Sequence, residues 1–136
     1  MSLRKSIFRC DRGASAIEFA LLAPVFFMML FGLVEFSRYA WTRQTLDEVA
    51  YSTARCMSVQ STCSSLATRQ THAVQRAAAY GVTIVAANVT PTSNTSCKGY
   101  SASNSVRITK VFNSPVQGFL PGLGDNIVST ACFPVL

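Results

Sequence analysis

A long apolar run near the N-terminus constrains this chain more than any other feature of its sequence. Residues 19–34 contain no charged side chain, and Glu18 is the only charged residue in the stretch 14–34. A helix rises about 1.5 Å per residue, so this stretch would span about 31 Å, close to the hydrocarbon thickness of a bilayer. The sequence therefore predicts a transmembrane helix over residues 14–35.

The charges that precede the run predict its orientation. The first twelve residues, which lie in what we call the leader (residues 1–13), hold half of the formal net charge of +6. They contain four basic residues and one acid: Arg4, Lys5, Arg9, Arg12 and Asp11. Basic residues stay on the cytoplasmic side, so we expect a cytoplasmic N-terminus and an extracytoplasmic domain over residues 36–136. A cleaved secretory signal is the alternative, but no small-x-small cleavage site follows the run. The sequence after the apolar run also has no stripe of Lys and Arg residues with aromatic residues between them. We therefore predict no nucleic-acid partner.

The cysteines fit an oxidising compartment. Cys10 lies in the leader, whereas Cys56, Cys63, Cys97 and Cys132 form an even set downstream. Four cysteines allow three pairings, and we favour Cys56 with Cys63 and Cys97 with Cys132. The first pair would close a short loop at the end of a helix, and the second would tie two strand-like segments. A zinc site is the competing interpretation, but no CxxC pair is present, so no metal is predicted.

Apolar residues keep helical spacing beyond the run, as far as Met57. This pattern predicts one helix over about residues 14–59, with an apolar stripe that needs covering where the helix leaves the membrane. Arg43 and Asp47 lie four residues apart on the opposite side, where we expect an i,i+4 ion pair.

A second helix is predicted over residues 64–80. Ser64 or Ser65 would be its N-cap, and Gly81 would end it. Four of its residues share one face, which we expect to pack against the first helix: Leu66, Ala73, Ala77 and Tyr80.

The composition changes after this helix to Ser, Thr, Asn, Gly and Pro. Three segments rich in Val, Ile and Thr, residues 82–89, 105–112 and 127–133, predict strands. Turn signals separate them at residues 91–94, 113–115 and 118–125. The predicted fold class is therefore α+β: a long membrane-spanning helix that continues into a small domain of one helix and an antiparallel sheet.

Side chains for catalysis are scarce. His72 is the only histidine, and its place on the second helix predicts a solvated surface position. The acids Asp47, Glu48 and Asp125 are not placed together for acid–base work, and the glycine-rich residues 118–125 lack the Lys-Ser/Thr of a phosphate loop. We predict no enzyme activity, no cofactor and no small-molecule substrate.

Glu18 is the informative residue because it places a carboxylate in the first turns of the apolar run. An acid at the centre of a bilayer costs on the order of 2.5 to 3.5 kcal/mol on insertion scales, so such a residue is a candidate functional site. The alternative is that Glu18 reaches toward the headgroups and favours the helix N-terminus through the dipole.

The context of Glu18 carries a family resemblance. A basic leader ends at Gly13, Glu18 is the fifth residue after it, and Pro24 is the eleventh, within the sequence GASAIEFALLAPVFFMMLFGLVEFSR. This segment resembles a class III signal of the type IV pilin kind, which a prepilin peptidase cuts after the glycine. Within that group it is similar to the TadE-like family, the pilin-like minor proteins of tight-adherence (Flp) pili.

The resemblance implies a function. Residues 1–13 would be a prepilin leader, Gly13 and Ala14 would flank the processing site, Glu18 would dock subunits, and Pro24 would kink the helix. The chain would be a minor pilin that takes part in the assembly or initiation of an adhesive pilus. Its partners would be prepilin peptidase, other pilins or minor pilins, the inner-membrane assembly platform and the membrane itself.

The implied location is the bacterial inner membrane, crossed once, with a periplasmic C-terminal domain; incorporation into an extracellular pilus stays open. The alternative function is an uncleaved, single-pass anchored module that binds or adheres through its periplasmic domain.

Overall fold

A computed structural model describes residues 14–115 and 126–135 of the chain. The chain divides into two compact units, Met1–Phe36 and Ser37–Leu136, which we call the N-terminal unit and the C-terminal unit. Helix α1 (Ala14–Val59) runs through both. The leader, including Gly13 of the predicted processing site, and the predicted turn at residues 118–125 lie outside the described residues.

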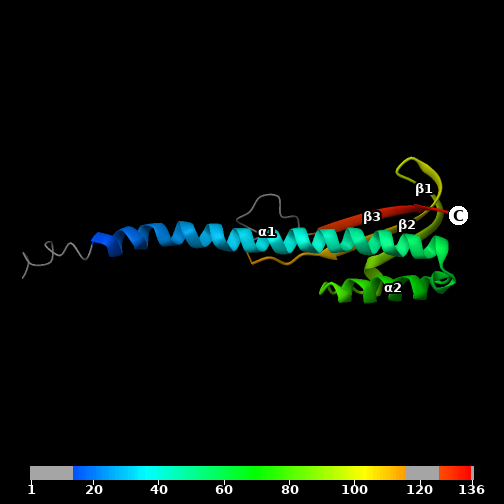
Figure 1. The fold of residues 1–136 in the computed structure, drawn as a ribbon, viewed down its shortest axis with the longest axis horizontal. Coiled ribbons are helices and arrows are strands. Elements are labelled where there is room, and N and C mark those ends of the chain that lie inside the picture. Colours follow the sequence, from blue (N-terminus) through cyan, green and yellow to red (C-terminus); the bar gives the residue numbers. More distant parts are fainter. Residues whose placement is uncertain (1–13, 116–125, 136) are drawn as a thin grey trace, which may run out of the picture. The chain divides into compact units, whose positions relative to one another are not determined.

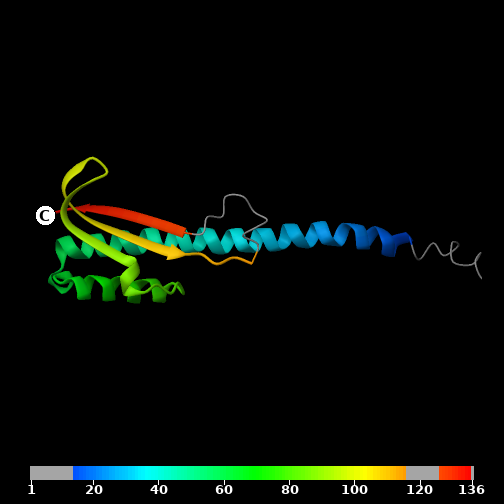
Figure 2. The same cartoon turned by 180° about the vertical axis from the view of Figure 1, so that it is seen from behind.

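Residues 37–59 of α1 and the elements that follow this helix build the C-terminal unit (Figures 1 and 2). A short 3-10 helix, η3 (Ser61–Cys63), leads into α2 (Leu66–Ala79), which lies beside the C-terminal part of α1. A second 3-10 helix, η4 (Ala86–Asn88), precedes the strands β1 (Val89–Cys97), β2 (Tyr100–Val111) and β3 (Asn126–Pro134). The strands form an antiparallel sheet in the order β1-β2-β3. The predicted α+β fold class is therefore confirmed.

Local sequence explains where α2 begins and ends. Ser65 is its N-cap and forms a capping box with Thr68, in which each side chain accepts a hydrogen bond from the other residue's backbone N–H. At the other end, the N–H groups of Gly81 and Val82 donate to the carbonyls of Ala78 and Ala77. Gly81 has a φ of 75°, which completes a Schellman motif and ends the helix as predicted.

The core of the C-terminal unit lies between α1, α2 and one face of the sheet. Alternation along β2 shows this face: Val106 and Ile108 are fully buried, whereas Arg107 between them is exposed. The other helices and strands complete the core with Leu46, Val49, Ala50, Ala54, Ala73, Ala77, Val89 and Ile127.

The predicted buried face of α2 is wrong at both of its ends. Ala73 and Ala77 are buried, but Leu66 is 57% exposed and Tyr80 is 38% exposed. Leu66 is the first residue of the helix and Tyr80 is its C-cap. Tyr80 instead contacts Arg76, whose guanidinium lies 5.8 Å from the centre of the phenol ring.

The first predicted strand is also misplaced. Residues 82–85 form no strand, although Val82 and Ile84 are buried, and β1 covers the segment 91–94 where the sequence predicts a turn. This Ser/Thr/Asn-rich segment pairs with β2 through register shifts, and Asn94 adopts a φ of 49° within them. The hairpin turn lies at Lys98 and Gly99, both with positive φ, as a tight two-residue hairpin connection requires.

Candidate functional site

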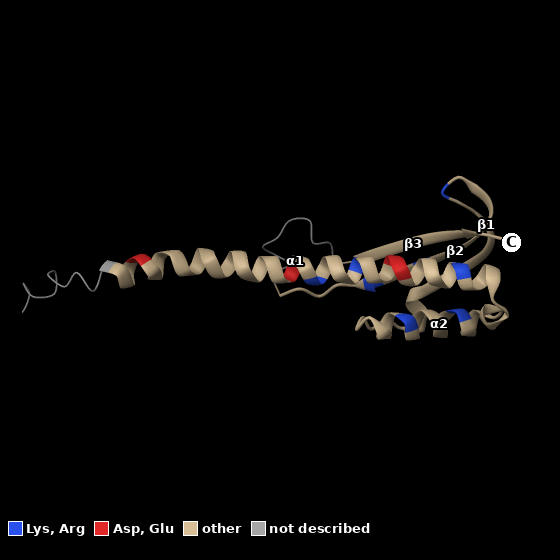
Figure 3. Ribbon diagram, viewed as in Figure 1, with Lys and Arg blue, Asp and Glu red and all other residues tan. Residues whose placement is uncertain are grey.

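The N-terminal part of α1 exposes an almost continuous apolar surface. The helix is the one element of residues 14–115 and 126–135 that is long and apolar enough to cross a membrane, and its most apolar window is not buried at all. Figure 3 shows how few charges interrupt it. Fourteen large apolar side chains are exposed there: Ile17, Phe19, Leu21, Leu22, Val25, Phe26, Phe27, Met28, Met29, Leu30, Phe31, Leu33, Val34 and Phe36.

Glu18 is the acid within this surface. Its side chain is exposed, and it makes no ion pair or hydrogen bond with any residue of the described part of the chain. Glu18 follows Ala14 by four residues in the same helix, which places the two on neighbouring positions of one face. Pro24 lies inside α1 and offers no N–H to the carbonyl of Ala20.

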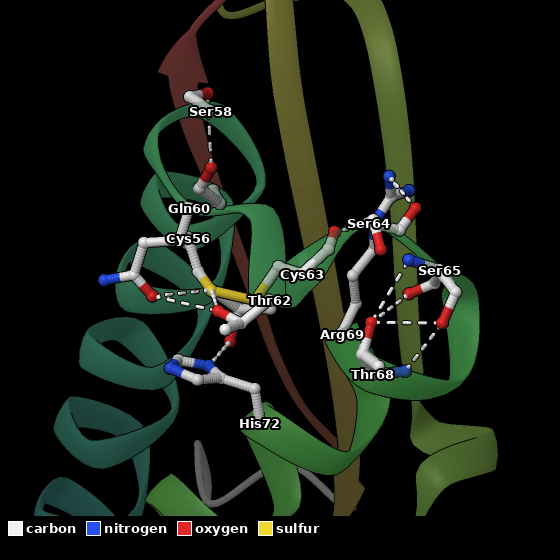
Figure 4. Close-up of a disulfide and its surroundings, with 12 residues drawn as sticks. Cys56, Ser58, Gln60, Thr62, Cys63, Ser64, Ser65, Thr68, Arg69 and His72 are labelled. Atoms are coloured by element: carbon white, nitrogen blue, oxygen red, sulfur yellow. Dashed lines mark hydrogen bonds between the residues drawn. A yellow bond between two sulfur atoms is a disulfide. The ribbon is translucent and has the colours of Figure 1, made fainter.

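The C-terminal unit contains both disulfides that the sequence favours. Cys56 at the end of α1 is bonded to Cys63 in η3, with a Cα–Cα distance of 5.8 Å. Cys97 at the end of β1 is bonded to Cys132 in β3, with a Cα–Cα distance of 6.0 Å. The first closes the turn between the helices (Figure 4), and the second joins the two edge strands of the sheet.

His72 occupies a different environment from the predicted solvated surface. The side chain is half-buried, and its Nδ1 lies 3.3 Å from Oγ1 of Thr53 on α1. Because the Thr53 hydroxyl already donates its proton to the carbonyl of Val49, at 2.7 Å, it accepts from His72. This hydrogen bond assigns the proton of the neutral ring to Nδ1. Burial and then the nearby Arg76 lower the pKa of His72 below its ordinary value of 6.5.

His72 also lies next to the first disulfide (Figure 4). Ligand atoms of Cys56, Cys63 and His72 all lie within 4.8 Å of one another, a spacing compatible with a metal ion. The two sulfurs are bonded to each other, however, and the form of cysteine that binds metals is the thiolate. The cluster is therefore built as a structural joint between α1 and α2.

A groove of about 510 Å³ lies on the C-terminal unit between α1 and the end of α2, and sequence reasoning missed it. The indole Nε1 of Trp41 donates to the carbonyl of Tyr80 at 3.3 Å, and Glu48 forms an ion pair with Arg76 at 3.7 Å. The sequence predicts that Tyr80 packs against the first helix, so it gave no signal for an open groove at this residue. The groove is lined by Trp41, Gln44, Thr45, Asp47, Glu48 and Tyr80.

Asp47 does not form the predicted ion pair with Arg43. Its Oδ1 accepts a hydrogen bond of 2.6 Å from the hydroxyl of Ser129 on β3. A contact between residues so far apart in the sequence is invisible to an i,i+4 argument. The side chain of Arg43 is exposed, and no hydrogen bond or ion pair joins this side chain to another residue in the ranges 14–115 and 126–135.

The segment that carries Glu18 and Pro24 also carries a family match. Residues 13–55 match the family model described as TadE-like protein. Neither a curated protein nor a solved structure matches the chain. The match confirms the predicted resemblance. It covers α1 from its first residue, Ala14, to residue 55, immediately before Cys56. Residues 13–55 of this chain are therefore a TadE-like segment.

Proposed function

We propose that this chain is a minor pilin that prepilin peptidase processes after Gly13 and that takes part in assembling or initiating a tight-adherence pilus used in surface adhesion. The observation that carries the proposal is the TadE-like match over residues 13–55, because this segment contains the glycine, the acid and the exposed apolar helix together.

Cleavage would give Glu18 a chemical partner. A new α-amine on Ala14 would be cationic at neutral pH, and it would stand four residues before the carboxylate on an apolar helix. Charges withdrawn from water are costly unless they are paired. When the apolar helices of several subunits associate, the amine of one copy and the carboxylate of its neighbour would therefore select the register in which they meet.

Pro24 would help a processed subunit to leave the membrane. Because proline cannot donate to the carbonyl of Ala20, it removes one helical hydrogen bond from the apolar part of α1. A weakened turn lets the helix bend as it passes from lipid into a bundle of subunits. Substituting Pro24→Ala would restore this hydrogen bond, and we expect it to reduce pilus assembly while the protein still inserts into the membrane.

The partners follow from the same steps. The peptidase would recognise the leader and Gly13, the inner-membrane assembly platform would move the processed subunit, and other pilins or minor pilins would receive its helix. Helix α1, the one candidate membrane span among the residues that the structure describes, supports membrane anchoring. The proposed location is the inner membrane with the C-terminal unit in the periplasm, as the basic leader and the disulfides favour.

The experiment that tests the proposal determines the N-terminus of the mature protein and the need for the charge of Glu18. Mass spectrometry of the membrane protein from cells that contain the peptidase should find Ala14 as the first residue. In cells that lack the wild-type copy, Glu18→Gln should abolish pilus assembly without changing the protein level, and Glu18→Asp should retain part of it.

The alternative is an anchored module that binds through its disulfide-tied sheet without processing. A native protein that still begins at Met1, together with normal pili in Glu18→Gln cells, would overturn the pilin proposal and favour this alternative.

A further inference from the structure

The Cys56–Cys63 disulfide and the ring of His72 form one compact cluster, which we call the sulfur–imidazole cluster (Figure 4). Ligand atoms of the three residues lie within 4.8 Å of one another, and both cysteines are buried. While the sulfurs are bonded to each other they cannot act as thiolates, the form of cysteine that binds metals. A disulfide is formed from a dithiol, however, so the reduced chain presents two thiols and an imidazole at this place.

The spacing of the cluster suits a tetrahedral metal ion. Zinc binds cysteine sulfur at about 2.3 Å and histidine nitrogen at about 2.0 Å, so the ligand atoms of a tetrahedral zinc site lie about 3.5 to 3.8 Å apart. The Cα atoms of Cys56 and Cys63 are 5.8 Å apart. Once the bond between the sulfurs is open, rotation about the two Cα–Cβ bonds can bring the sulfurs to the distance that zinc requires.

The backbone around the two cysteines is held by contacts that do not depend on the disulfide. Arg69 on α2 donates from Nε to the carbonyl of Cys63 at 2.8 Å and from Nη2 to the carbonyl of Ser64 at 3.1 Å. The N–H of Cys63 donates to the carbonyl of Gln60 at 3.3 Å, and the N–H of Gln60 donates to the carbonyl of Cys56 at 3.0 Å. These hydrogen bonds are available to the reduced chain, so they keep the two thiols close together.

The ring of His72 is held as a metal ligand needs to be held. A metal-bound histidine almost always donates its remaining ring N–H to a nearby polar group, which fixes the orientation of the ring. Oγ1 of Thr53 serves this purpose at 3.3 Å, and its hydroxyl is anchored in turn to the carbonyl of Val49 at 2.7 Å. A neutral imidazole keeps one nitrogen without a proton, and that nitrogen can bind an ion.

A cavity of about 300 Å³ gives a path from solvent to the cluster. Cys63 and His72 are among the residues that line it, together with Thr62. Oγ1 of Thr62 also lies 3.8 Å from Sγ of Cys56, where its hydroxyl can donate a hydrogen bond to a thiolate. An ion can therefore reach the sulfurs through this cavity, and water from it can take the coordination position that the three side chains leave open.

The ligand set selects the metal. Thiolates bind zinc and copper(I), and imidazole suits zinc as well, whereas calcium and magnesium require oxygen ligands. Zinc accepts a tetrahedral site of mixed sulfur and nitrogen ligands with one position left to water. No CxxC pair marks such a site in the sequence, because the fold brings the third ligand from α2 to a cysteine pair at the end of α1.

We propose that the dithiol form of this chain binds one Zn²⁺ through the sulfurs of Cys56 and Cys63 and a ring nitrogen of His72, and that closing the disulfide releases the ion. Binding displaces the two thiol protons. Closing the disulfide transfers two electrons from the sulfurs to a disulfide-bonded oxidant, which takes up two protons and becomes a dithiol. The zinc site and the disulfide are therefore alternative states of one joint between α1 and α2. All three ligands belong to the C-terminal unit, so the proposal does not depend on processing of the leader.

The second disulfide provides a matched control. The Cα atoms of Cys97 and Cys132 are 6.0 Å apart, close to the value for the first pair. His72 is the only histidine of the sequence, however, so the second pair has no imidazole beside it. Reduction of either disulfide gives two thiols at similar spacing, and only the first pair should bind zinc tightly.

Metal titration of two full-length variants in detergent tests this difference. Both carry Cys10→Ser; one also carries Cys97→Ser/Cys132→Ser and keeps the first pair, and the other carries Cys56→Ser/Cys63→Ser and keeps the second. Each is reduced with a phosphine, freed of it without oxygen, and titrated with Co²⁺ as a coloured substitute for Zn²⁺. The first should bind one Co²⁺ with the visible bands of a tetrahedral ion, about 100-fold more tightly than the second. Reoxidation of the first should release the metal.

Two measurements identify His72 as the third ligand. His72→Gln in the chain that keeps the first pair should weaken Co²⁺ binding at least about tenfold, since even partners that only orient a ligand contribute that much. X-ray absorption at the zinc edge of the loaded chain needs no substitution at His72. It should find two sulfurs at about 2.3 Å and an imidazole nitrogen at about 2.0 Å.

Several results would overturn the proposal. Equal Co²⁺ affinity of the two reduced variants would show that any dithiol of this chain binds the ion. Unchanged affinity in His72→Gln, or a zinc shell without imidazole, would remove the third ligand. Binding that survives reoxidation would place the metal elsewhere in the chain. Absence of Co²⁺ binding by the reduced first pair would refute the site itself.

Discussion

Nδ1 of His72 on α2 donates a hydrogen bond to Oγ1 of Thr53 on α1 across 3.3 Å. The contact lies beside the Cys56–Cys63 disulfide, so a covalent bond and a polar side-chain contact join the two helices at the same end (Figure 4). The hydrogen bond and the disulfide together hold α2 against the buried face of α1, which forms part of the core.

The protonation of His72 should make stability depend on pH. Burial and Arg76 lower its pKa in the folded chain below 6.5, so the unfolded chain takes up a proton first as the pH falls. The melting temperature of the full chain in detergent should therefore be insensitive to this group above pH 7 and decrease as the pH falls below 6.5. His72→Gln, which keeps a donor for Thr53, should remove this part of the pH dependence; an unchanged profile would contradict the assignment.

The two disulfides should differ in their contribution to stability. Loop-closure entropy predicts about 2.4 kcal/mol for the Cys56–Cys63 loop, with a separation of 7 residues, and about 3.8 kcal/mol for Cys97–Cys132, with a separation of 35. Urea unfolding of the Cys56→Ser/Cys63→Ser and Cys97→Ser/Cys132→Ser variants measures both. A larger loss for the shorter loop would show that strain or residual structure, rather than chain entropy, decides the order.

Gly81 should resist substitution because of its backbone and not because of its surroundings. A Cβ at this position would meet no atom within 4 Å, but the φ of 75° is strained for an L side chain. Gly81→Ala should lower the free energy of unfolding by about 1 to 2 kcal/mol, and Gly81→Asn should lower it less, since asparagine visits this conformation more readily. Equal losses for the two variants in thermal unfolding would argue against backbone strain.

Ser65 caps α2 and its neighbour Ser64 does not, so substitutions of the two serines give a matched test of the capping box. Ser65→Ala removes the acceptor for the backbone N–H of Thr68 and should cost about 0.5 to 2 kcal/mol in unfolding measurements. Ser64→Ala, one residue earlier, leaves this acceptor in place and should stay within about 0.5 kcal/mol of the wild type. The prediction fails if the two variants are equally destabilised.

The sequence alone determined the features that depend on local pattern. An apolar run with helical spacing defines α1 whatever it packs against, and the glycine, Glu18 and Pro24 at fixed spacing identified the TadE-like segment. The pairing of the cysteines could also be predicted from the sequence, because a short loop after a helix and two strand-like segments restrict which sulfurs can meet. Gly81 ended α2 where its conformational freedom predicts a stop.

Only the tertiary structure decided the contacts between distant residues. The segment at residues 91–94 reads as a turn, but pairing with β2 draws it into β1, because backbone hydrogen bonds to a neighbouring strand outweigh weak local preferences. Asp47 bonds Ser129 rather than Arg43, and His72 lies against Thr53 rather than in solvent, since β3 and α1 come beside them only in the folded chain.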